Sequence, residues 1–191
     1  MKTFYKIIKL FIEDKKGKTI REIAKEINAD YKITHLAVQK LIQKNVLATS
    51  IVGKSTLCTL NKQYYGTEIY LSEDIRKEEL LANKDIQIVY KEIMKKINSC
   101  LFIFLAFGSH TKKTATKYSD IDLLFISNKK GFEEKILSIT SLLPLKVHVF
   151  VFTEKEFLLM KDKKESNLIK EVLENNTILY NIEGFYKLKN A

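Results

Sequence analysis

Two carboxylates and a Gly-Ser pair are the residues of this 191-residue chain whose types and spacing could do chemistry. Asp120 and Asp122 open an apolar segment that predicts a strand over residues 121–126, and side chains two apart in a strand point to the same side. Two such carboxylates repel each other unless a cation lies between them, and the usual ion is Mg²⁺, which also recruits phosphate oxygens. Gly108 and Ser109 end a strand predicted over residues 101–107, where the backbone can approach a phosphate and the hydroxyl can bond it. The pattern therefore predicts a site for a metal ion and a phosphate-bearing ligand.

The stretch that joins these residues is Phe-Gly-Ser-His-Thr-Lys-Lys-Thr-Ala-Thr-Lys-Tyr-Ser-Asp-Ile-Asp-Leu-Leu-Phe, residues 107–125. It resembles the signature of the nucleotidyltransferase superfamily typified by DNA polymerase beta, and within it the minimal nucleotidyltransferases. The resemblance combines an apolar strand, Gly-Ser, Ser-Asp-x-Asp and an apolar continuation. It implies a small mixed sheet flanked by helices, which matches the order of predicted elements over about residues 85–160.

The family's reaction is displacement at the α-phosphorus of a nucleoside triphosphate, with pyrophosphate leaving and two metal ions held by three carboxylates. For this chain the resemblance implies transfer of a nucleoside monophosphate, with AMP from ATP as the expected group. Asp120 and Asp122 would hold Mg²⁺ or Mn²⁺. The implied nucleotide-binding residues are Gly108, Ser109, Lys112, Lys113 and Ser119, and Lys117 could add charge to the same pocket.

The third carboxylate of the family lies on the strand after the next helix, and this chain has none there. The strand is predicted over residues 146–152, and its inward position holds His148. A histidine can ligate a transition metal or act as a base, but it is a poor Mg²⁺ ligand. His148 is therefore a catalytic candidate beside Asp120 and Asp122. The alternative is a partly buried strand histidine without a metal role, in a protein that binds nucleotide and has lost turnover.

The net charge of +10 is concentrated in the first third of the chain. Residues 1–62 hold 13 Lys and Arg against 5 Asp and Glu, a net charge of +8, and the remainder has a net charge of +2. This asymmetry predicts a separate basic module that meets a polyanion. The alternative is that these lysines are ordinary exposed surface residues of a lysine-rich protein and bind no polyanion.

Residues 2–45 show three helical patterns, and alternating segments at 46–52 and 56–60 predict a hairpin around Gly53-Lys54. The second helix begins with the capping-box spacing of Thr19 and Glu22. The third, predicted over residues 31–44, would bury Ile33, Ala37 and Leu41 with Leu36 or Val38. This order resembles a winged helix-turn-helix domain over about residues 2–61. The resemblance implies contacts to DNA or RNA from Lys32, Thr34, His35, Gln39 and Lys40, and from Lys54 at the wing tip; such domains also serve as protein-interaction or dimerisation modules.

The predicted organisation is therefore α/β (α+β): a winged helix-turn-helix domain over 1–66, a helical connector over 67–84 and a nucleotidyltransferase-like domain over 85–191. In the last, the pattern predicts helices over residues 85–97, 110–115, 131–142, 154–161 and 165–174.

Composition favours a cytoplasmic protein without a membrane segment. Cys58 and Cys100 are too few for a disulfide framework or a zinc site. The first twelve residues predict an amphipathic helix rather than a signal peptide, because Lys6 and Lys9 interrupt the apolar positions. The longest apolar run, residues 100–107, is too short to span a membrane.

Three functions stay open on the sequence alone. The first is a transferase that acts on a protein, an RNA or a small molecule, including an antitoxin that modifies a partner toxin. The second is a transcriptional regulator or antitoxin that binds nucleotide, DNA or a partner protein without turnover. The third is an RNA-directed transferase whose N-terminal domain holds its substrate. A homodimer is compatible with each.

Overall fold

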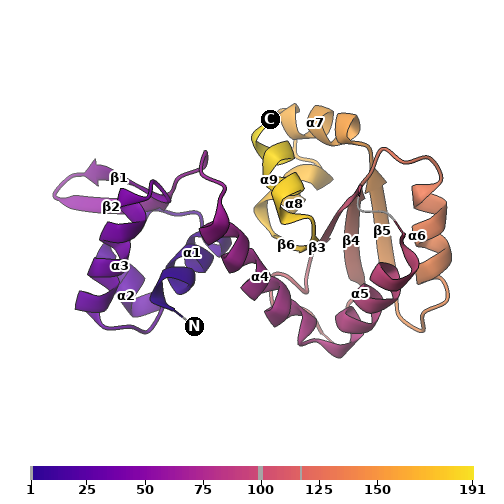
Figure 1. Cartoon of the computed structure of the whole chain (residues 1–191), viewed down its shortest axis with the longest axis horizontal. Helices are drawn as coiled ribbons and strands as arrows, with labels where there is room; N and C mark the ends of the chain where they lie inside the picture. The colour runs from indigo at the N-terminus through magenta and orange to yellow at the C-terminus, as the bar shows by residue number, and fades with distance from the viewer. Residues whose placement is uncertain (1, 99–100, 117) are drawn as a thin grey trace. The chain divides into compact units, whose positions relative to one another are not determined.

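The computed structural model describes residues 2–98, 101–116 and 118–191. The chain divides into two compact units, Met1–Glu73 and Asp74–Ala191 (Figure 1). No helix within the described ranges is long and apolar enough to cross a membrane. Cys100 and Lys117, both considered in the sequence, lie outside the described residues.

In the first unit, helices precede a hairpin. Its elements are α1 (Thr3–Glu13), α2 (Ile20–Glu26), α3 (Tyr31–Gln43), β1 (Leu47–Val52) and β2 (Ser55–Leu60), followed by α4 (Thr67–Leu81), which crosses the boundary between the units. The strands pair antiparallel from Leu47 opposite Leu60 to Val52 opposite Ser55, with Gly53 at a φ of 60° in the predicted turn. Glycine adopts this left-handed conformation without the strain that other residues meet.

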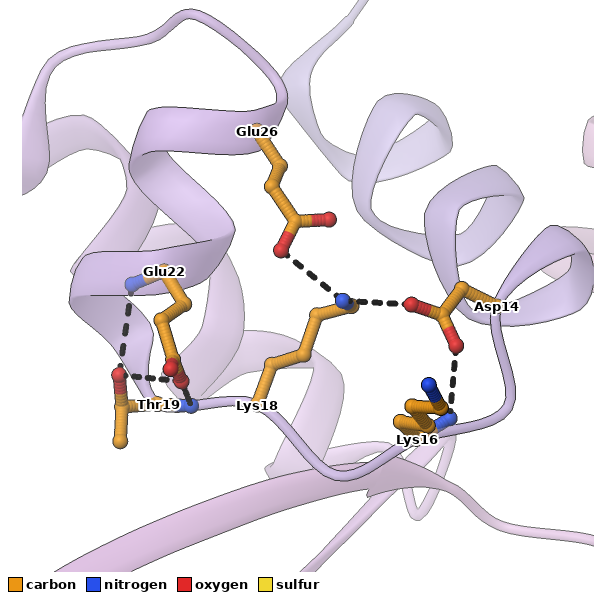
Figure 2. Close-up of polar contacts among 6 residues, drawn as sticks. All are labelled: Asp14, Lys16, Lys18, Thr19, Glu22 and Glu26. Carbon is orange, nitrogen blue, oxygen red and sulfur yellow. Dashed lines mark hydrogen bonds and ion pairs between the residues drawn. The ribbon is translucent and has the colours of Figure 1, made fainter.

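The start of α2 is fixed by the predicted capping box (Figure 2). The Glu22 N–H donates to Thr19 Oγ1 at 3.3 Å, and the Glu22 carboxylate accepts from the Thr19 N–H at 2.7 Å. These bonds satisfy two N–H groups that the first helical turn leaves without partners. The prediction for this helix start is confirmed.

Lys18 is a buried cation just before that cap (Figure 2). Its ammonium nitrogen donates to Asp14 Oδ2 at 2.7 Å and to Glu26 Oε1 at 2.9 Å. The hydrogen bond to Asp14, then the one to Glu26, raises the pKa of Lys18, and the Asp14 pKa is lowered by the bonds from Lys18 and from the Lys16 N–H. Lys18 therefore holds the segment after α1 to the last turn of α2.

The end of α3 is tied to the start of α4 through one carboxylate. Lys44 Nζ donates to Glu68 Oε1 at 2.6 Å, and the Tyr64 hydroxyl donates to Glu68 Oε2. These bonds, that from Lys44 first, lower the pKa of Glu68 to about 2. Burial, together with the bond to Glu68, raises the pKa of Tyr64 to about 12.

The faces of α3 differ from the sequence prediction. Thr34, expected on the exposed face, is fully buried, and its hydroxyl donates to the Asp30 carbonyl at 2.8 Å. Ile33, expected in the core, is 55% exposed, and Leu36 is 63% exposed. The buried residues are Thr34, Ala37, Val38 and Leu41. Their successive spacings of three, one and three residues define one helical face, and Ile33 and Leu36 fall outside it.

The second unit combines a sheet with helices. Its elements after α4 are α5 (Lys84–Lys96), β3 (Ile103–Phe107), β4 (Ile121–Ile126), α6 (Phe132–Thr140), β5 (Val147–Phe152), α7 (Glu154–Asp162), α8 (Leu168–Glu174), β6 (Asn176–Tyr180) and α9 (Ile182–Asn190). The strand order is β5-β4-β3-β6, with β3 antiparallel to β4 and β6, and β4 parallel to β5 (Figure 1). This mixed α+β arrangement is consistent with the predicted fold class.

Alternate residues of the strands pack against α5 and α6. Phe104 and Phe125 stack with ring centroids 4.4 Å apart in a core that includes Val89 of α5 and Ile136 of α6. Two further helices, α7 and α9, contact each other through Phe157 and Phe185. Helix α9 also contacts strands β3 and β6. Helices therefore cover the central strands, which explains the unbroken apolar runs of β3 and β4.

Two predicted helices differ from the structure. Residues 110–113 form turns and residues 114–115 have no regular structure, because Lys113 has a φ of 57°, which a right-handed helix does not allow. The helix predicted from residue 165 begins at Leu168, where the Asn167 side chain accepts from the Lys170 N–H. A side-chain cap fixes a helix start more firmly than propensity does.

Candidate active site

Asp122 lies at the point where three strands bring the predicted site residues together. In the antiparallel pairing of β3 with β4 it faces Phe107, the residue before Gly108. In the parallel pairing of β4 with β5 it faces His148. The chain segments that carry Gly108, Asp122 and His148 are thus neighbours at one end of the sheet.

Strand alternation decides on which face the carboxylates lie. Leu123 and Phe125 belong to the core against α5 and α6, so Asp122 points to the other face. Asp120 precedes the strand by one residue and has the same parity as Asp122. Both carboxylates keep partial exposure, 33% for Asp120 and 25% for Asp122.

Gly108 makes room for the Asp122 side chain. Its φ is +74°, and a Cβ at this position would lie 2.2 Å from Asp122 Oδ2 and 3.1 Å from Asp122 Cγ. Any larger residue would collide with the carboxylate. The sequence predicted that Gly108 opens space for a phosphate, and the structure adds that it opens space for Asp122.

His148 lies across both carboxylates. Its Nδ1 is 3.2 Å from Asp122 Oδ1, and its Nε2 is 3.6 Å from Asp120 Oδ2. The side chain is 58% exposed, so the alternative prediction of a partly buried histidine is wrong in this respect. The reason is that β5 is the edge strand of the sheet and leaves this position open to solvent.

One atom of the pair has no partner. Asp120 Oδ1 is buried and accepts no hydrogen bond from the part of the chain that the structure describes. A buried carboxylate oxygen left without a donor is costly unless a ligand satisfies it. This orphaned oxygen fits a site that a cation completes.

The donor set fits Mg²⁺ or Mn²⁺ only together with a ligand that brings further oxygens. Across the described ranges, no three His, Cys, Asp or Glu side chains are grouped so that they alone could hold a metal ion. Two carboxylates are nevertheless the usual protein share of a Mg²⁺ site in which substrate phosphates and water supply the rest. Asp120 and Asp122 would hold the ion, which would neutralise the charge that develops on the phosphates.

The loop between β3 and β4 carries the remaining nucleotide candidates. Ser109 is half-buried beside Gly108, and Lys113 is exposed. Ser119 closes the loop, because its hydroxyl accepts from the Thr116 N–H at 2.9 Å. Lys112 is engaged elsewhere, with its Nζ 2.9 Å from Glu171 Oε1 of α8.

Two further residues of this region contact residues named as nucleotide candidates, and they were not predicted from the sequence. Glu171 follows Lys112 by 59 residues, so no local pattern could pair them. His110 Nε2 lies 3.4 Å from the Ser119 carbonyl oxygen and links the two ends of the loop. Its position directly after Gly108-Ser109 was the only available signal.

The nucleic-acid candidates belong to the first unit. Lys32, Gln39, Lys40 and Lys54 are exposed. His35 is only partly exposed, and its ring lies 6.0 Å from that of Tyr31. Thr34 is removed from the set by its burial in the core.

Comparison with known proteins bears on the second unit. Residues 88–180 match the family model described as nucleotidyltransferase domain. No curated protein and no solved structure shows a significant match to the chain. The matched range includes Gly108, Asp120, Asp122 and His148. It supports the assignment of this part of the chain to the nucleotidyltransferase superfamily.

Proposed function

We propose that the protein transfers a nucleoside monophosphate from a nucleoside triphosphate, with AMP from ATP as the expected group, to an acceptor hydroxyl. The observation that carries the proposal is the Gly108-Ser109 turn packed against Asp122, beside the orphaned oxygen of Asp120. Both features lie within the range that matches the nucleotidyltransferase domain.

The proposed roles follow from chemistry and position. The Ser109 hydroxyl and the adjacent backbone bind the triphosphate, and exposed Lys113 adds positive charge near it. Asp120 and Asp122 hold Mg²⁺ or Mn²⁺. The acceptor hydroxyl loses its proton to solvent, its oxygen forms a bond to the α-phosphorus, the bond from this phosphorus to the bridging oxygen breaks, and pyrophosphate leaves. The acceptor is a protein, an RNA or a small molecule.

The test uses the four nucleoside triphosphates labelled at the α-phosphate, with Mg²⁺ or Mn²⁺ and a cell lysate as the acceptor source. The wild-type protein is expected to label a protein, RNA or small-molecule fraction. The double variant Asp120→Asn, Asp122→Asn keeps side-chain size and removes both charges, and it is expected to label nothing. Equal labelling and equal nucleotide affinity in the two proteins would reject the site.

A second candidate is a catalytically impaired regulator or antitoxin that binds nucleotide, DNA or a partner protein. It is favoured by His148, which occupies the strand position beside Asp122 where the superfamily resemblance implies a carboxylate. Nucleotide binding that depends on Asp120 and Asp122, with no labelled product from any fraction, would select this candidate over the first. A partner toxin would then be recovered bound and unmodified.

For the first unit we propose a nucleic-acid partner. Residues 1–62 have a net charge of +8, and Lys32, Lys40 and Lys54 are exposed on α3 and at the hairpin tip. Neutralising phosphates with lysine makes affinity fall steeply with salt. Duplex DNA, duplex RNA and single-stranded RNA titrated at two salt concentrations would identify the partner, and an absence of binding to all three would reject the proposal.

A further inference from the structure

Strand β5 has an outer edge that pairs with no other strand of the described chain. It is the outermost strand of the sheet and pairs only with β4 (Figure 1). At the start of this pairing the Lys146 carbonyl accepts from the Ile121 N–H at 2.9 Å, and at its end the Phe152 carbonyl accepts from the Ser127 N–H at 2.9 Å. Even-numbered residues of β5 thus direct their backbone groups toward β4. The residues between them direct theirs outward, where no described residue binds them: Val147, Val149 and Val151.

The sequence of β5 does not protect this edge. Free edge strands usually carry charged residues or proline, which prevent pairing with another chain. Residues 147–152 read Val-His-Val-Phe-Val-Phe and include no Lys, Arg, Asp, Glu or Pro. Valine and phenylalanine favour extended structure. The edge of β5 is therefore suited to accept a further strand.

The two faces of β5 restrict how a further strand can pair. Val149 packs toward the core beneath α5 and α6, together with the other odd-numbered residues of the strand. Phe150 lies on the opposite face, with its ring 5.7 Å from that of Phe107. In an antiparallel pair, residues directly opposite each other share a face and share the direction of their backbone groups. A second copy of β5 meets both conditions when even residues lie opposite even ones and odd residues opposite odd ones.

Opposite charges at the two ends of β5 select one such register. Lys146 precedes the strand and Glu154 follows it, and both side chains are exposed. Neither has an ion-pair partner in the described part of the chain, whereas Glu156 is engaged in the capping box of α7 with Thr153. Lys146 and Glu154 each lie four residues from Phe150. Antiparallel pairing centred on Phe150 therefore brings Lys146 of each copy opposite Glu154 of the other.

We infer that two copies of the chain associate through antiparallel pairing of β5, with the two Phe150 residues opposite each other on a two-fold axis. The axis repeats every contact, so two pairs of Lys146 with Glu154 form. The same register places Phe152 of the second copy beside His148 and covers a side chain that is 58% exposed in the single chain. Each copy thus adds an aromatic ring to the border of the other's candidate active site. The inference does not depend on nucleotidyl transfer, because it concerns the edge of the sheet.

Exchange of the two charges is the direct test. Sedimentation equilibrium of the full chain over a range of concentrations should show a reversible dimer. Glu154→Lys and Lys146→Glu should each weaken it about tenfold, because two attractive pairs become repulsive, and the double variant should restore it. Glu133→Lys makes the same charge change at an exposed position in the first turn of α6 and should leave the dimer unchanged. An unaltered dissociation constant in Glu154→Lys, or no recovery in the double variant, would overturn the inference.

A disulfide tests the register. Phe150→Cys places two thiols in a non-hydrogen-bonded pair, where Cα atoms are about 4.5 Å apart, a separation that a disulfide can span. Mild oxidation should give a covalent dimer on a non-reducing gel. Phe152→Cys is the control, because its two copies would lie about 13 Å apart along the strands and should not cross-link. The unsubstituted chain shows any cross-link from Cys58 or Cys100. Equal cross-linking of the two variants would overturn the inference.

Two further results would also overturn it. A chain that remains monomeric at every concentration would leave the edge of β5 unpaired. Hydrogen exchange at the Val149 N–H should slow as protein concentration rises, since this group would bond to the second copy. Exchange that slows only when a cell lysate is added would assign the edge to a strand of another protein.

Discussion

Replacing Gly108 by alanine would place a methyl group in the space that the Asp122 side chain occupies. The added Cβ would lie 2.2 Å from Oδ2 and 3.1 Å from Cγ of Asp122. Rotation of the carboxylate alone cannot relieve the contact, because Cγ is also too close. The whole Asp122 side chain must shift by about 1 Å to restore an ordinary carbon–oxygen separation.

The expected cost has two parts. A left-handed conformation costs a non-glycine residue about 1–2 kcal/mol, and crowding adds about 1 kcal/mol or more. The shift of Asp122 should lower the rate of nucleotidyl transfer about 100-fold, because a displacement near 1 Å is enough to spoil a reacting geometry. The variant should therefore stay folded with little activity.

Gly131 provides the matched control. Its φ is +72°, close to that of Gly108, and a Cβ there would meet no atom within 4 Å. Gly131→Ala should lose about 1–2 kcal/mol in urea unfolding and keep full Mn²⁺ binding and transfer. If Gly108→Ala resembles Gly131→Ala in all three measurements, Gly108 does not act by making room for Asp122.

Other predictions address the scaffold and His148. Glu68→Gln should lower the free energy of unfolding on the order of 2 kcal/mol at neutral pH. Because the folded-state pKa of Glu68 is lowered to about 2, this loss of stability should shrink as pH falls below about 4.5. A loss of stability that does not change with pH would contradict the prediction. Lys18→Met should cost about 1–3 kcal/mol in urea, since it leaves two carboxylates without their cation, and an unchanged midpoint would refute that role. A fragment of residues 67–191 should unfold cooperatively in urea. A fragment of residues 85–191 should be less stable, because it lacks α4, whose Leu81 lies in the core. Equal urea midpoints for the two fragments would argue against a stabilising contribution from α4. His148→Asp should raise transfer with Mg²⁺ relative to Mn²⁺, because carboxylate oxygen suits Mg²⁺ better than imidazole does, and an unaltered ratio would separate His148 from the metal.

Much of the site could be predicted, because strand side chains two residues apart point to the same side of a sheet. The spacing of Asp120 and Asp122 fixes a common face, and the Gly-Ser pair marks the end of the preceding strand. The superfamily resemblance pointed to His148 as the residue at the position of the third carboxylate, whereas its register opposite Asp122 is seen only in the structure. The packing of Gly108 against Asp122 could not be predicted, because it depends on side-chain atoms of two strands.

The errors have physical causes as well. Ile33 and Leu36 are apolar, and periodicity assigns apolar residues to a core even where a helix exposes them. Thr34 is polar, but its hydroxyl is satisfied by the backbone of the preceding turn, which permits burial. The pairing of Lys112 with Glu171 joins segments far apart in the chain and has no local signal.

The central claim is tested most directly by the position of the label. The protein is incubated with ATP labelled at the α-phosphate or at the γ-phosphate, with Mg²⁺ or Mn²⁺ and a lysate, beside the Asp120→Asn, Asp122→Asn variant. The account predicts that a product retains the α-label, that the γ-label leaves as pyrophosphate, and that the variant forms neither. A product labelled only from the γ-phosphate, or α-labelling undiminished in the variant, would contradict nucleotidyl transfer at this site.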